Sequence, residues 1–226
     1  MFKQLIIITF FISTISTYSQ THKAVYSYRI EHPEIDYVES YETVNELALH
    51  NELYVFFDKN ESLYISENVL NGRIGLDDAS TGAIDPLRFN KANNSVLLIY
   101  HDTYTNQQYC ITHDVVPIWT ITEETKNIDG YLCIKAVGKM EHITDPTRHT
   151  TIEAWFAPDI PYAYGPSTAV GLPGLVVYMV QNNRKKYKLE RIIFNTEENI
   201  LEKMTCEGEQ LDRAGYSNLI KQGINY

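Results

Sequence analysis

Hydrophobic and polar residues alternate along this chain, or the hydrophobic ones form short runs rich in β-branched and aromatic side chains. Both patterns are typical of β-strands, and turn-forming pairs such as Asn71-Gly72 and Asp129-Gly130 separate them. Helical patterns of ten or more residues do not alternate with these segments, so an antiparallel sheet is predicted. The predicted strands are 24–30, 52–57, 62–65, 95–101, 107–112, 118–122, 131–137, 150–156, 175–180 and 186–194.

The spacing of these strands predicts the fold class and the number of domains. Helices are predicted only at 37–50 and 216–222, and no repeat or linker divides the chain. The sequence therefore predicts a mostly β, single-domain protein, built on a curved antiparallel sheet or a partly open barrel with little helix.

The first residues have the order of a secretory signal. Lys3 precedes an apolar run at 5–12, and small polar residues follow. As a helix that run would be about 12 Å long, too short to cross a bilayer, and no later stretch is apolar enough to do so. We expect a signal peptide at 1–19, a domain at 20–226, and export to the periplasm or the extracellular space without a transmembrane span.

The net charge and the cysteine count limit which partners and which disulfides are expected. The chain has 226 residues and a net charge of −10, which argues against nucleic-acid binding because phosphates require a basic surface. Three cysteines in an exported chain allow one disulfide. A bond between Cys110 and Cys133, which lie on two predicted strands and close a short loop, is preferred; three buried reduced thiols are the alternative.

Candidate catalytic residues are scattered. None of the seven histidines has the spacing of a metal motif, and the nucleophile-elbow, phosphate-loop and dinucleotide motifs are absent. We therefore predict no metal and no cofactor. A hydrolase or metallopeptidase is the less favoured reading, and it would need histidines such as His101 and His113 to meet across neighbouring strands.

A loop punctuated by proline and glycine follows the strand that ends at Pro158. Its last part, residues 172–175, fits a type II turn with a positive φ at Gly174. Loops of this length without a helix are often functional. The loop is predicted either to form a rigid lid, with Trp155, Tyr162 and Tyr164 packed beneath it, or to contact a ligand directly.

The motif Gly171-Leu-Pro-Gly174-Leu-Val176 resembles the signature of the GLPGLI family, exported Bacteroidetes proteins of unknown function. The tryptophan strand around Trp119, the segment Cys133-Ile-Lys135-Ala136 and the strand around Trp155 are similar to that family and come in the same order. Residues 145–149 stand where the family often carries Gly-Arg. The resemblance implies an exported cell-envelope protein and supplies no catalytic residue.

Together these features favour a non-enzymatic protein that binds an apolar or extended ligand, lipid or peptide, on the concave face of the sheet. The alternative is a protein–protein module that docks on an outer-membrane partner through the loop and a sheet edge, with Trp155 or the Tyr162–Tyr164 pair exposed. The predicted contact residues are Trp119, Trp155, Pro161, Tyr162, Tyr164, Gly171, Pro173 and Gly174.

Overall fold

A computed structural model of the chain describes residues 20–31, 52–72, 85–102 and 105–223. Within these residues, twelve strands form one sheet in the order β12-β6-β5-β4-β3-β2-β1-β11-β10-β9-β8-β7. The mostly β prediction is confirmed, and the sheet is not closed into a barrel. The predicted signal peptide and the predicted helix at 37–50 lie outside the described residues.

The strands are β1 (His22–Ile30), β2 (Leu53–Phe57), β3 (Glu61–Ser66), β4 (Leu87–Asn90), β5 (Ser95–Asp102), β6 (Gln107–His113), β7 (Ile118–Ile128), β8 (Tyr131–Glu141), β9 (His149–Ala157), β10 (Leu175–Gln181), β11 (Lys185–Ile193) and β12 (Glu209–Asp212). The helices are α2 (Glu67–Leu70), α3 (Ile200–Lys203) and α4 (Arg213–Gly223). None of the described helices is long and apolar enough to cross a bilayer.

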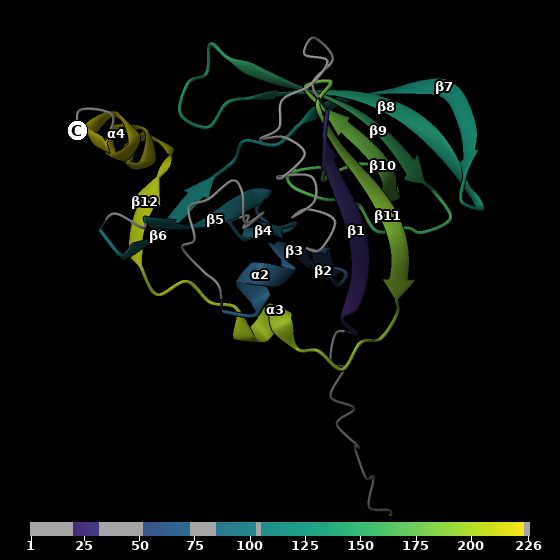
Figure 1. Cartoon of the computed structure of the whole chain (residues 1–226). Helices are drawn as coiled ribbons and strands as arrows, with labels where there is room; N and C mark the ends of the chain where they lie inside the picture. Colours follow the sequence, from purple (N-terminus) through teal and green to yellow (C-terminus); the bar gives the residue numbers. More distant parts are fainter. Residues whose placement is uncertain (1–19, 32–51, 73–84, 103–104, 224–226) are drawn as a thin grey trace, which may run out of the picture.

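Neighbouring strands are antiparallel except β12, which pairs in parallel with β6. Figure 1 shows the long strands β7 to β11 and β1 side by side on the right, with the shorter strands β2 to β6 continuing the sheet towards the left. Alternation determines which face is buried. In β9, Ile152, Ala154 and Phe156 are buried, and Thr151 on the other face is exposed.

The main core lies on one face of the sheet, between the half formed by β7 to β11 with β1 and the half formed by β2 to β6. It includes Tyr26 from β1, Phe57 from β2, Phe89 from β4 and Phe156 from β9. A second, smaller core covers the opposite face of β1, β2 and β3, where α2 and α3 supply buried apolar side chains such as Leu201. The start of β1 is therefore buried on both faces, which fixes it at the centre of the fold.

The loop at 158–174 packs into the main core. Tyr164 lies against Phe57 and Phe89, with ring centroids 5.9 and 6.3 Å away, and so reaches from β9 and β10 to the other half of the sheet. Backbone hydrogen bonds fold the loop onto itself and onto β10: Gly171 N–H donates to the Ala163 carbonyl at 2.9 Å. The loop is thus an inserted layer of the core.

The type II turn predicted at the end of this loop is wrong. Gly174 does not have a positive φ; Gly171 does, at 90°. A β-turn at 172–175 would join the Leu172 carbonyl to Leu175 N–H. Instead, Leu175 N–H donates to the Ile160 carbonyl, and the Leu172 carbonyl accepts from Gly174 N–H. Position 174 requires glycine for lack of room, because a Cβ there would lie 2.3 Å from the Ala157 carbonyl oxygen.

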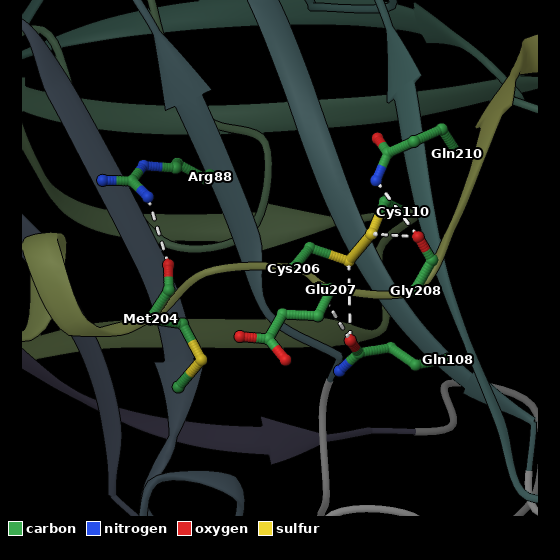
Figure 2. Close-up of a disulfide and its surroundings, with 8 residues drawn as sticks. All are labelled: Arg88, Gln108, Cys110, Met204, Cys206, Glu207, Gly208 and Gln210. Atoms are coloured by element: carbon green, nitrogen blue, oxygen red, sulfur yellow. Dashed lines mark hydrogen bonds between the residues drawn. A yellow bond between two sulfur atoms is a disulfide. The ribbon is translucent and has the colours of Figure 1, made fainter.

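The predicted Cys110–Cys133 disulfide is also wrong. Cys110 on β6 bonds to Cys206, in the segment between α3 and β12, as Figure 2 shows. Cys133 is a buried free thiol on β8. The sheet order explains the error: β6 is next to one edge strand and β8 is next to the other, so closeness in sequence did not mean closeness in space.

Candidate functional site

Trp119 fastens the loop at 158–174 to the edge of the sheet. Its indole lies directly over Gly138 of β8, where a Cβ would come within 2.6 Å of the ring. Its Nε1–H donates to the Val170 carbonyl at 2.7 Å. The geometry gives this predicted contact residue a structural role.

The side chains of Tyr162 and Tyr164 pack against other residues of the protein. Tyr164 is buried, and Tyr162 is half-buried, with its hydroxyl 2.7 Å from Nε2 of His22. Asn195 N–H donates to Nδ1 of His22, so the neutral ring carries its proton on Nε2 and donates to Tyr162. Burial also lowers the pKa of His22, which favours this neutral form. The two tyrosines therefore do not form the exposed patch that the docking alternative predicted.

Trp155 does not lie beneath the loop. It sits between the buried Ala154 and Phe156 on β9, so its side chain leaves the sheet on the opposite face. Lys135 lies 5.8 Å from its ring centroid and 3.3 Å from a Glu153 carboxylate oxygen. Of the other predicted contact residues, Pro161, Gly171 and Pro173 are exposed, and Gly174 is buried.

His101 and His113, which a metal or catalytic site would have to bring together, do not converge. In the β5–β6 pair, His101 is opposite Gln108 and His113 is opposite Val96, so the two imidazoles lie towards opposite ends of the pair. Among the described residues, no group of three or more His, Cys, Asp or Glu side chains could hold a metal ion.

A cleft of about 780 Å³ lies on the face of β7, β8 and β9 that points away from the main core; we call it the outer cleft. Apolar side chains supply much of its surface: Ile118 is 81% exposed and Val137 is 46% exposed. Register places Ile118 opposite Lys139 and Thr120 opposite Val137, so these side chains share one face. The lining residues are Asp114, Val115, Val116, Ile118, Thr120, Val137, Gly138, Lys139, Glu141, His149, Thr151 and Arg213.

The C-terminal arm, residues 205–223, reaches the outer cleft through one side chain, that of Arg213. Arg213, at the start of α4, donates to the Ile143 carbonyl at 2.9 Å and to the His142 carbonyl at 3.0 Å, and it pairs with Glu141 at 2.9 Å. The Cys110–Cys206 disulfide and the four-residue strand β12 hold the arm on β6. Figure 1 shows β12 beside β6 at the left of the molecule, with α4 following it.

Sequence reasoning did not single out the outer cleft. Its walls come from the β6–β7 connection, from β7, β8 and β9, and from α4, which only the tertiary fold brings together. One signal was available: Ile118 and Trp119 are adjacent, so this strand carries a large apolar side chain on each face.

A second cleft of about 690 Å³ adjoins the other side of Arg213, and His113 lines it. His113 is buried, and its Nδ1 accepts from Val115 N–H at 3.2 Å. Its pKa is lowered to about 4, chiefly because burial disfavours the charged ring; the Asp114 charge opposes this shift, and the Arg213 charge adds to it. His113 is therefore neutral at pH 7.

This lowered pKa predicts loss of stability in acid. The folded state takes up the His113 proton less readily than the unfolded chain, whose histidine titrates near 6.5. The stabilisation is complete above that pH and is lost as the pH falls towards 4. Urea unfolding from about pH 7.5 to about pH 5 should show a loss of about 2 kcal/mol from this group. His113→Asn retains an acceptor for Val115 N–H and should lose correspondingly less; equal pH dependence in both proteins would contradict the assignment.

Residues 139–178 match the model of a family described as a protein of unknown function, Porph_ging. The matched segment contains β9, the loop at 158–174 and the start of β10. This agrees with the coarser part of the predicted resemblance, a family without a known function. No curated protein matches the chain in sequence.

Solved structures of PNGF-II in two crystal forms are similar to the chain. The first has a TM-score of 0.62 and 18% identity, and covers 90% of this chain and 34% of that one. The second has a TM-score of 0.57 at 18% identity, and covers 86% and 31%. At this identity the similarity shows the fold alone, and the chain spans about a third of the length of the proteins it matches.

Proposed function

We propose that this chain is an exported, non-catalytic binding module that holds an apolar or extended ligand in the outer cleft. The observation that carries the proposal is the exposure of Ile118 and Val137 on the floor of a cleft with charged groups around it. Large apolar side chains left in water at a concave site mark a place where a ligand or partner removes them from water.

The size and composition of the outer cleft support this proposal. Its volume of about 780 Å³ falls within the range of ligand sites, roughly 300–1,000 Å³. The main core offers no comparable place in the region predicted to bind, because Tyr164, Val170 and Leu172 from the loop are buried there. We therefore place the ligand on the outward face of β7 to β9.

Export is supported by two independent features. Residues 1–19 have the order of a secretory signal. A disulfide between Cys110 and Cys206 suits an oxidising compartment such as the periplasm or the extracellular space. In the alternative of docking on an outer-membrane partner, a segment of that partner would occupy the same cleft.

Replacing Val137 with aspartate tests the site. Binding of the apolar fluorophore N-phenyl-1-naphthylamine should weaken about tenfold or more, because the variant loses apolar contact and places a charge on the floor. Fluorescence titration gives the affinity, and thermal unfolding verifies the fold.

Leu132→Asp is the matched control. Leu132 lies on the same strand and is 59% exposed, but it is outside the outer cleft. This variant should bind as the wild type does. Equal losses in both variants, or no binding by the wild type, would contradict the proposed function.

A further inference from the structure

We infer that the ligand of the outer cleft is an extended polypeptide, which adds a strand to the free edge of β7 at residues 118–121. This inference rests on the proposed function and names its ligand class. It joins two features that lie side by side: an edge strand with unused backbone groups, and the outer cleft on one face of that strand.

Within the part of the chain that the structure describes, the edge of β7 is available for pairing. β7 ends the sheet, and of the described strands only β8 pairs with it. Among the described residues, none outside β8 forms a backbone hydrogen bond with residues 118–121. Alternate N–H and C=O groups of this segment therefore point away from the sheet, and an incoming strand can satisfy them.

An irregularity limits the length of this edge. Pairing between β7 and β8 shifts register between Ile121 and Thr125. Within the shift, Thr122 Oγ1 donates to the Lys135 carbonyl at 3.2 Å, and Glu124 N–H donates to Thr122 Oγ1 at 3.2 Å. Such bulges bend an edge strand and interrupt pairing, and the charged residues that follow protect it further. The regular part of the edge is thus the part beside the outer cleft.

The faces of β7 then determine where the ligand's side chains go. Ile118 and Thr120 line the outer cleft, whereas Trp119 between them turns to the core side and bonds to Val170. A strand paired with this edge would place every second side chain over the same face. Those side chains would meet Ile118 and Val137, so apolar residues at alternate positions are the expected specificity.

Charge around the outer cleft favours a polypeptide over a lipid. The rim carries both signs, with Lys139 and Arg213 against Asp114 and Glu141. Arg213 and Glu141 pair with each other, which leaves no excess of cations for an acyl carboxylate or a phosphate. A peptide backbone supplies neutral donors and acceptors in the spacing of the β7 edge, whereas an acyl chain carries no hydrogen-bonding groups.

The test is a backbone N-methylation scan of one peptide. The probe is a fluorescein-labelled peptide of four Thr-Val repeats with a lysine at each end, and fluorescence anisotropy measures its binding to the full chain. Strand addition predicts a two-residue period: methylation at every second amide near the centre weakens binding about tenfold, and at the amides between them less than about twofold.

The outcomes separate this inference from the proposed function. If all methylated peptides bind like the parent, or lose affinity equally, strand addition is wrong. It is also wrong if the peptide fails to bind while N-phenyl-1-naphthylamine binds and Val137→Asp weakens it, although the outer cleft would then still be a binding site. If neither probe binds, both proposals fail together.

Discussion

Removing the disulfide by Cys206→Ala should lower the free energy of unfolding by about 4 kcal/mol, because the bond closes a loop of about a hundred residues in the unfolded chain. The bonded cysteines are 96 positions apart. Urea unfolding at neutral pH measures this loss. Cys133→Ala is the control, since it removes a buried thiol that makes no disulfide, and it should cost only about 1 kcal/mol.

The same variant should release the C-terminal arm selectively. β12 has four residues, is largely exposed and, among the described strands, pairs with β6 alone, so without the disulfide little apolar burial holds it. Arg88, which donates to the Met204 carbonyl at 3.1 Å, would still anchor the chain just before the arm. Hydrogen exchange in β12 and α4 should therefore approach the rate of an unfolded segment, whereas β9 and β10 should stay protected up to the lowered free energy of global unfolding. Unchanged protection of β12 would show that pairing alone holds the arm.

Gly174→Ala should destabilise the protein by about 3 kcal/mol or more, because the new methyl group would overlap a backbone carbonyl that cannot move freely. The Cβ would lie 2.3 Å from the Ala157 oxygen and 2.7 Å from its carbon. Ala157 is the register partner of Leu175, so relieving the overlap would disturb the pairing of β9 with β10. Chemical unfolding followed by tryptophan fluorescence measures the effect.

The exposed neighbour Pro173 provides the control for this prediction. Pro173→Ala should change stability by less than about 1 kcal/mol, since it mainly alters the freedom of the unfolded chain. If Gly174→Ala were as stable as the wild type, then the close approach to Ala157 would not be the reason for glycine at this position.

The strands with clear alternation could be predicted from sequence, and β9 is the clearest case, with buried and outward residues alternating from His149 to Phe156. β4 (Leu87–Asn90) and β12 (Glu209–Asp212) were missed. β12 has a single apolar residue, and its strand conformation depends on parallel pairing with β6 and on a disulfide to the same strand. Neither dependence is visible in a local window.

The candidate site was harder to predict, because the most distinctive residues turned out to build the core. Trp119 bonds to the loop, Tyr164 fills the space between the two halves of the sheet, and Gly174 permits a close backbone approach. The outer cleft is instead lined by residues that belong to no distinctive motif, such as Val137 and Arg213, and that lie far apart in the sequence. Their common location depends on how the sheet bends, which periodicity does not encode.

The most direct measurement of where a ligand binds is an amide chemical-shift titration of the isotopically labelled protein with the Thr-Val peptide. The largest shifts should fall on residues 118–121 and on Val137 and its neighbours in β8, with small changes in the loop at 158–174. Shifts centred on Tyr164, Phe57 and the other residues of the main core would contradict the outer cleft as the binding site.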